Sequence, residues 1–211
     1  MRRRALYLGV LGVLGLSLAA GALAATSPVV PAGGKVAGKG YAYYLKRVWL
    51  LNFAGSPPLS CSTLTVGGQK VALLRTTPQK SAKCNEPAGR AIYVHELTNE
   101  CSTLKGDHPG FGTTNADLVK CAKAFFNGPV IYSATLDGQA VDLHALLAAT
   151  GEFFVPKVVG QSAPTARSAA YGPGILLRGL SKGTHTVYST ASGPGGVDHS
   201  TLKCTWAEQH R

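Results

Sequence analysis

The sequence predicts a mainly β fold, a disulfide-stapled β-sandwich or jelly roll with one short helix at about residues 114–126. Many short apolar runs are separated by turn-forming residues, which is the pattern of strands and turns in such folds. Gly and Pro number 26 and 12 of the 211 residues, too many for a helix bundle and without a collagen period. With 45% hydrophobic residues the chain is not wholly disordered, and its length is typical of one domain.

The first 25 residues have the features of a secretory signal peptide. Three arginines follow Met1, residues 5–25 carry no charge, and small residues surround the expected cleavage site. We expect cleavage after Ala24 or Ala25 and a secreted or periplasmic protein. An uncleaved anchor is the alternative, because an uncharged segment of this length is able to span a bilayer. No later stretch is comparably apolar, so we expect no transmembrane segment after cleavage.

The remaining chain divides into a spacer and a single domain. Residues 26–40 are rich in Pro and Gly and predict a flexible spacer. Residues 41–211 predict one β-sandwich domain. Its first segment, residues 41–53, is aromatic and apolar, and it fits either the first strand or a short amphipathic helix packed on the fold.

Two glycine-containing turns predict hairpins. Gly67-Gly68 separates Val66 from the apolar residues 71–74. Asp137-Gly138 separates residues 130–136 from residues 139–143, and this dipeptide suits a type I′ turn, which needs positive φ at both central positions.

The helix is predicted from its start, its spacing and its end. Thr114 or Asn115 is a suitable N-cap, and Asp117 places negative charge in the first turn, where it suits the helix dipole. The apolar residues between 118 and 126 follow helical spacing, and the Asn-Gly-Pro sequence at 127–129 ends the helix.

Further strands are predicted from short apolar runs. Residues 91–94 form one strand, and residues 200–206 form the last. Residues 174–179 and 185–190 are predicted to pair with each other through the connection at 181–183. Residues 143–149 fit either a helix or a strand, and the sequence leaves both open.

All five cysteines follow the predicted signal peptide, so export would place them where disulfides persist. An odd number allows at most two bridges and leaves one thiol. Cys101–Cys121 is the preferred pair, because it closes a short, polar, glycine-rich loop. Cys61, Cys84 and Cys204 compete for the second bridge, and the sequence does not choose among them. No C-x-x-C is present, which argues against a thioredoxin-type redox site and a zinc ribbon.

The chain is basic, with 21 Lys and Arg against 10 Asp and Glu. Loss of residues 1–25 removes three arginines and no acidic residue, which leaves a charge of +8. Such a surface attracts acidic polymers, and the partner we expect is an acidic polysaccharide or another cell-envelope component. Nucleic acid is not expected, because export separates the chain from it and no nucleic-acid motif is present.

The stretch from Cys84 to about Thr190 carries an ordered series of short motifs. These are Cys84-x-x-Pro87-Ala-Gly-Arg-Ala-Ile-Tyr93, Asn99-Glu-Cys101, Leu118-Val-Lys-Cys121, Thr135-Leu-Asp-Gly138 and Leu180-Ser-Lys-Gly-Thr-His-Thr-Val187. Their order and spacing resemble a family of uncharacterised secreted β-sandwich proteins of bacteria and fungi. The resemblance covers about half of the mature chain. It implies a β-sandwich, a secreted location and a Cys101–Cys121 bridge, and it supplies no catalytic residues.

Three side chains are weak functional candidates, and each has a structural interpretation that we favour. Glu100 would act as an acid or base if a second carboxylate stood about 5–9 Å away, and no such partner can be named. His95 precedes a glutamate as in zinc-protease helices, but position 99 is Asn where a second His is needed. His185 fits a cross-strand residue better than a ligand. No catalytic set, cofactor site or metal site is predicted.

The leading hypothesis is therefore a non-catalytic secreted or periplasmic protein that binds a cell-surface polymer or an envelope partner. One alternative is a small secreted hydrolase with a carboxylate site near Glu100. The other is a structural envelope protein joined to a partner through the odd cysteine. Surface aromatics would favour sugar binding, although most are better explained as core residues; they are Tyr41, Tyr43, Tyr44, Trp49, Tyr171 and Trp206. No oligomeric state is predicted.

Overall fold

The structure is a computed structural model that describes residues 27–55, 61–75, 81–104, 111–155, 166–193 and 196–207. For residue 193 and residues 196–207 it describes the backbone alone. The predicted signal peptide, residues 1–25, lies outside the described residues. Within the described part of the chain, no helix has both the length and the apolar character needed to cross a membrane.

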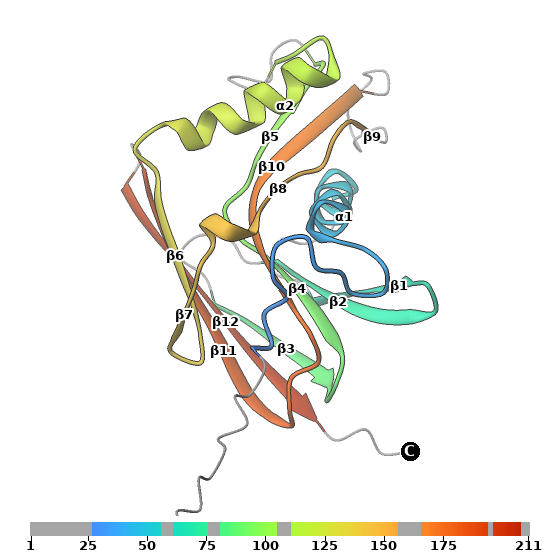
Figure 1. Ribbon diagram of the computed structural model, residues 1–211, viewed down its shortest axis with the longest axis vertical. Helices are drawn as coiled ribbons and strands as arrows, with labels where there is room; N and C mark the ends of the chain where they lie inside the picture. The colour runs from blue at the N-terminus through green and yellow to red at the C-terminus, as the bar shows by residue number, and fades with distance from the viewer. Residues whose placement is uncertain are drawn as a thin grey trace, which may run out of the picture.

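Two β-sheets face each other, which confirms the predicted mainly β, sandwich-like fold (Figure 1). The larger sheet has the order β1 (Cys61–Val66), β2 (Gln69–Arg75), β4 (Ala91–His95), β10 (Ala166–Leu177), β5 (Asn99–Ser102). Two further strands, β8 (Leu147–Ala149) and β9 (Phe153–Val155), also pair with β10. The smaller sheet has the order β3 (Ser81–Pro87), β12 (Gly196–Ala207), β11 (Gly183–Gly193), β6 (Ile131–Leu136), β7 (Gln139–Val141).

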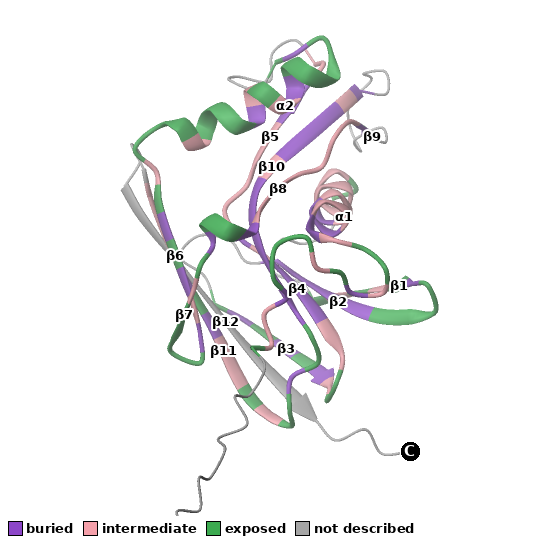
Figure 2. Cartoon of the chain, viewed as in Figure 1, coloured by how far each residue is buried: buried purple, intermediate pink, exposed green. Residues whose placement is uncertain are grey.

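The main core lies between the two sheets. Alternate residues of several strands point into it, as a period of two requires. Strands β2, β4 and β10 supply apolar side chains from the larger sheet, and β3, β6 and β11 supply them from the smaller one. Burial is continuous along most of β10, whose ribbon carries the buried colour over much of its length (Figure 2).

A helix, α1 (Tyr41–Phe53), forms a third layer on the other face of the larger sheet. Its buried residues Tyr41, Tyr44, Leu45 and Val48 recur at the spacing of one helical face. This resolves the segment that fitted either a strand or a helix, and it adds a second helix to the one predicted. A strand was the wrong alternative because its period of two would alternate these residues between faces.

The segment before α1 contributes to the core, in contrast to the flexible spacer predicted for residues 26–40. Val30 is fully buried, and its amide donates a hydrogen bond to the carbonyl of Leu176 at 2.8 Å. The Tyr44 hydroxyl donates to the carbonyl of Val36 at 2.8 Å. The sequence predicts a spacer here because the segment is rich in Pro and Gly. Val30 and Val36, which anchor the segment in the structure, are too far apart in the sequence to form a periodic pattern.

The predicted helix is confirmed as α2 (Asn115–Ala124), followed by the 3₁₀ turn η1 (Phe125–Asn127). Thr114 is the N-cap, and its side chain accepts a hydrogen bond from the amide of Asp117 at 3.1 Å. The Asp117 carboxylate accepts in turn from the amide of Thr114, which completes a capping box.

Both predicted glycine-containing hairpins are confirmed, as β1–β2 and β6–β7. Asp137 and Gly138 have φ of 52° and 80°, the positive values that a type I′ turn requires. The segment that fitted a helix or a strand contains both, a 3₁₀ turn η2 (His144–Leu146) followed by β8.

The predicted pairing of residues 174–179 with residues 185–190 is wrong. Strand β10 belongs to the larger sheet and β11 to the smaller one, so the connection between them passes from one sheet to the other. The last predicted strand, found as β12, is the antiparallel partner of β11 instead. A hairpin between β10 and β11 and the observed crossover between the sheets would both bury apolar residues. Local turn signals in the sequence do not distinguish these two arrangements.

Replacing Val30 tests whether residues 27–40 are part of the fold. We expect Val30→Ala to lower the free energy of unfolding by about 2 kcal/mol, because it removes buried methyl groups and leaves a cavity. Urea unfolding of the mature chain measures this. Lys35→Ala is the control in the same segment, and its exposed side chain predicts a change within about 0.5 kcal/mol. Equal effects of the two substitutions would support the free spacer.

Candidate functional site

Two disulfides are present, and the preferred Cys101–Cys121 pair is confirmed. It joins β5 to α2, and both cysteines lie in a small cluster with Leu118 and Ala122. The second bridge is Cys61–Cys84, which joins β1 of the larger sheet to β3 of the smaller sheet. Cys204 on β12 is therefore the fifth cysteine.

Glu100 lies on β5 next to this disulfide and contacts the neighbouring strand β10. The hydroxyl of Ser168 donates a hydrogen bond to the Glu100 carboxylate and lies 3.1 Å from the carbonyl of Cys101. Ser168 is fully buried. These contacts hold β5 against β10, so the structure gives Glu100 a role in strand packing.

His95 lies at the end of β4 under α1. Its Nε2 is 2.7 Å from Oγ1 of Thr98, and the same hydroxyl accepts a hydrogen bond from Nε1 of Trp49 at 3.2 Å. The Trp49 ring meets the imidazole edge-on, with centroids 6.3 Å apart. Burial, together with the nearby charge of Arg75, lowers the pKa of His95 to about 4. The ring is therefore neutral near pH 7 and ties β4 to α1.

His185 lies on β11 and contacts the turn between β6 and β7. Its Nδ1 is 2.6 Å from Oδ2 of Asp137, and its Nε2 is 3.2 Å from the carbonyl of Ser181. The other oxygen of Asp137 accepts from the amide of Thr186 at 2.8 Å. Nδ1 thus contacts the turn between β6 and β7, whereas Nε2 contacts the connection between β10 and β11. The sequence contains no local signal for this pair, because its members are 48 residues apart.

The three candidate side chains lie at separate places in the fold. Glu100 packs β5 on β10, His95 lies under α1, and His185 holds a turn of the smaller sheet. Among the described residues, no three His, Cys, Asp or Glu side chains are grouped so that they could hold a metal ion.

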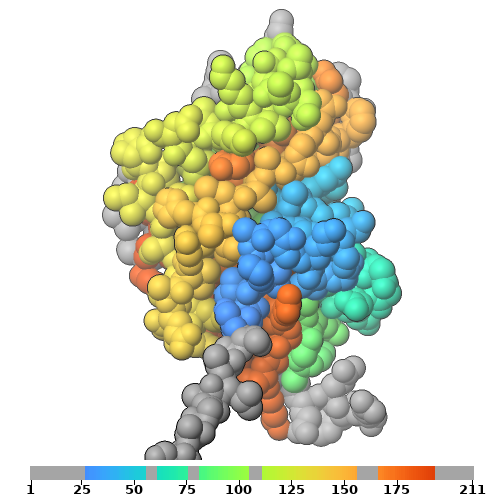
Figure 3. All heavy atoms as spheres, in the orientation of Figure 1, coloured from blue at the N-terminus to red at the C-terminus, as the bar shows by residue number. Residues whose placement is uncertain are grey.

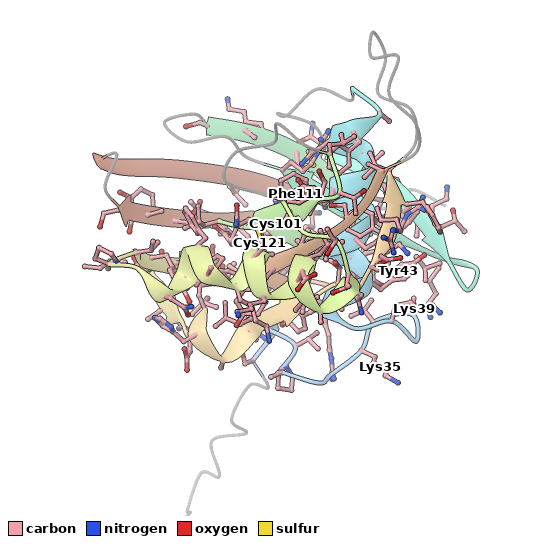
Figure 4. The ribbon with its side chains drawn as sticks, turned by 90° about the horizontal axis from the view of Figure 1, so that it is seen from above. Lys35, Lys39, Tyr43, Cys101, Phe111 and Cys121 are labelled. Atoms are coloured by element: carbon pink, nitrogen blue, oxygen red, sulfur yellow. A yellow bond between two sulfur atoms is a disulfide. The ribbon has the colours of Figure 1, made fainter. Side chains whose placement is uncertain are left out.

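A different feature distinguishes the surface, a group of cations and one tyrosine on α1 and the turn before it that we call the basic patch. It consists of Lys35 and Lys39 from the turn before α1, and Tyr43, Lys46 and Arg47 from α1. Lys35, Lys39 and Tyr43 lie on the same side of the molecule (Figure 4). The space-filling view shows the blue N-terminal segment spread over one face of the molecule (Figure 3).

Specific contacts hold the basic patch in place. Nζ of Lys39 lies 5.4 Å from the centroid of the Tyr43 ring, a cation–π distance. The turn that carries Lys39 is closed by paired backbone hydrogen bonds of 2.9 Å between Val36 and Lys39. Lys46 and Arg47 lie three and four residues after Tyr43 in α1. Residues at this spacing share one face of a helix.

No negative charge opposes these cations from their own segment, because residues 27–55 contain no Asp or Glu. The N-terminal end of α1, with its positive partial charge, adds to the field. The described carboxylates elsewhere are engaged within the fold. Their partners are Arg90 for Glu86, Ser189 for Glu96, Ser168 for Glu100, Thr113 and Thr114 for Asp117, His185 for Asp137, the Ala145 amide for Asp142 and Arg167 for Glu152.

The aromatic residues considered for sugar stacking divide into core and surface. Tyr41 and Tyr44 are buried and bond to the backbone of the preceding segment, as the core explanation predicts. Tyr43 is partly exposed within the basic patch. The side chain of Trp206 lies outside the described residues. Tyr43 is therefore a stacking candidate with a cation on its ring, and Tyr171 is a second, with Nζ of Lys123 5.3 Å from its ring centroid.

Comparisons with known proteins add no family to this description. No protein-family model matches the chain, and no curated protein sequence matches it. Among solved structures, the solution structure of Amebosin matches with 10% sequence identity over 62% of this chain and 90% of that one. Its TM-score of 0.22 is too low for the likeness to bear on fold or function.

Two buried groups of opposite kind set the expected pH dependence of stability. Burial raises the pKa of Glu96 from 4.5 to about 7, so the folded protein binds a proton that the unfolded chain has released, and stability falls as pH rises through this range. The pKa of His95 falls from 6.5 to about 4, so stability falls as pH drops through that range. Between pH 4.5 and 6.5 the two slopes oppose each other and nearly cancel.

Substitution of Glu96 or His95 leaves the contribution of the other residue to the pH dependence of stability. We expect the unfolding free energy of Glu96→Gln to rise with pH between 4 and 6.5, and that of His95→Gln to fall between 4.5 and 7. The slope of each is at most about 1.4 kcal/mol per pH unit, the value for one proton. Urea unfolding across this pH range measures both. Profiles parallel to that of the native chain would contradict the assignment.

Proposed function

We propose that this chain is a non-catalytic, extracytoplasmic binding module that attaches to an acidic polysaccharide of the cell surface through the basic patch. The observation that carries the proposal is a group of four cations on α1 and the turn before it, with Lys39 on the Tyr43 ring, in a segment without Asp or Glu. The three sequence candidates Glu100, His95 and His185 are engaged in contacts between elements of the fold. We therefore assign function to the surface.

The expected location supports an extracellular partner. Two disulfides join distant elements, and such bridges persist in oxidising compartments. The signal peptide predicted for residues 1–25 would deliver the chain there. We also propose that the chain is related to the secreted β-sandwich proteins that the motifs between Cys84 and Thr190 resemble.

A polymer fits the basic patch better than a small anion does. One exposed ion pair contributes only about 0–1 kcal/mol and is screened by salt. A polymer with regularly spaced carboxylates contacts several of these cations at once, and the contributions accumulate along one chain. Tyr43 adds a flat, partly exposed ring on which a sugar ring can stack.

Removal of two lysines from the basic patch tests the proposal. We expect Lys35→Ala/Lys39→Ala to bind immobilised polygalacturonate about tenfold more weakly than the native chain at low salt, a change of about 1.4 kcal/mol. The matched control is Lys70→Ala/Lys83→Ala, which removes the same charge from exposed positions on β2 and β3. Equal losses in both variants would show that total charge alone drives binding and would overturn the assignment of the site.

Substitution of Tyr43 separates stacking from charge attraction. If a sugar ring stacks on Tyr43, Tyr43→Ala should lose most of the binding that survives high salt, because stacking is much less sensitive to ionic strength. Binding to neutral dextran under the same conditions is the control for attraction that does not depend on charge. Failure of the native chain to bind polygalacturonate at low salt would contradict the proposed function.

A further inference from the structure

Two cysteine positions and His185 are aligned across neighbouring strands of the smaller sheet. In the smaller sheet, Cys84 on β3 is in register with Cys204 on the parallel strand β12. Cys204 is in register with His185 on the antiparallel strand β11. Cys84 is also bonded to Cys61 on β1, which belongs to the larger sheet. Cys84 therefore lies between two other cysteine positions.

Both neighbours of Cys84 are within reach of a disulfide. The Cα atoms of Cys61 and Cys84 are 5.9 Å apart. Residues in register on adjacent strands lie about 4.8 Å apart and on the same face of the sheet. Disulfides join Cα atoms separated by about 4.4–6.8 Å, so the backbone permits either bond.

We propose that Cys84 is shared between two alternative disulfides, Cys61–Cys84 and Cys84–Cys204, which interconvert by thiol–disulfide exchange. The thiolate of Cys204 attacks the sulfur of Cys84, a new Cys84–Cys204 bond forms, and the Cys61–Cys84 bond breaks. Cys61 leaves as a thiolate and takes up the proton that Cys204 released. The step is an isomerisation, so it needs no oxidant or reductant.

The position of His185 favours this exchange. Exchange proceeds through the thiolate, and a histidine beside a cysteine favours the loss of the thiol proton. His185 holds the register position beside Cys204, and its ring is fixed by Asp137 and the carbonyl of Ser181. A role in this exchange is independent of the basic patch and of the ligand proposed for it.

Exchange would change which parts of the molecule are covalently joined. The Cys61–Cys84 bond ties β1 to the smaller sheet, whereas a Cys84–Cys204 bond lies within that sheet. The alternative bond therefore removes the covalent tie between the smaller sheet and β1, an edge strand of the larger sheet that stays paired with β2. It also leaves an exposed thiol at Cys61, where the disulfide of another protein can attach by a second exchange.

A matched pair of cysteine variants tests the proposal. In oxidised Cys61→Ser, we expect Cys84 and Cys204 to resist iodoacetamide and to be recovered as one disulfide-linked peptide. In Cys84→Ser, which has the same number of cysteines, we expect Cys61 and Cys204 both to react. Near-UV circular dichroism checks that each variant is folded. Reaction of both Cys84 and Cys204 in folded Cys61→Ser would overturn the proposal.

The native chain provides a second test that does not depend on a variant. Incubation without added reductant, followed by acid quenching and peptide mapping, should yield both the Cys61–Cys84 and the Cys84–Cys204 peptides. The Cys101–Cys121 peptide serves as the internal control, because neither alternative involves it. Recovery of Cys61–Cys84 alone, with Cys204 always free, would overturn the proposal even if Cys61→Ser fails to fold.

Discussion

Strand β10 is the constraint on which most of the structure depends, because it pairs with four strands and has buried residues on both faces. It pairs with β4, β5, β8 and β9. Its side chains enter all three apolar clusters, through Ile175 between the sheets, Leu176 under α1 and Ala169 beneath α2. Both helices and the smaller sheet are therefore positioned against one strand, and their relative placement depends on its register.

Two glycines on β10 make room for the contacts that reach the basic patch. A Cβ at Gly174 would collide with the hydroxyl of Tyr93 on β4, and one at Gly172 would lie 2.6 Å from the carbonyl of Leu97. The Tyr93 ring fills the space left at Gly174 and stacks on Tyr44 of α1 with centroids 5.8 Å apart. Burial raises the pKa of Tyr93 well above its usual value, so this phenol stays neutral.

The tyrosines of α1 then fix the segment that carries the exposed lysines. Tyr41 and Tyr44 donate hydrogen bonds to the carbonyls of Val30 and Val36. Lys35 and Lys39 flank Val36, so their backbone is held by the same contacts that bury Val30. A segment fixed in this way presents its charges without the entropy cost of ordering a free tail on binding. The core thus explains why the basic patch has a defined shape.

Features that depend on a few adjacent residues were predictable from the sequence. The Asp137-Gly138 turn, the Thr114 cap and the nearby Cys101–Cys121 pair each follow from local chemistry. Features that depend on distant residues were not, and these include the partner of β11 and the contact of Asp137 with His185. Pairing of strands across a sheet is decided by burial over the whole domain, which local turn signals do not contain.

The sequence contains a signal for the basic patch that the overall charge of the chain does not reveal. The first acidic residue of the chain is Glu86, and eight lysines and arginines lie between residue 26 and that point. Spread along the sequence, these charges form no run, and the cations scatter over several elements. The structure places four of them on α1 and the turn before it, and the turn brings Lys39 onto the Tyr43 ring. Charge asymmetry along a chain is thus informative even without a cluster.

The most direct test of this account is a map of backbone amide chemical shifts in the mature chain as polygalacturonate fragments are added. The account predicts that the largest changes fall within residues 35–47, and that they are lost when salt screens the charges. Changes centred on the exposed face of the smaller sheet, or on the surroundings of Glu100, would contradict the assignment of binding to the basic patch.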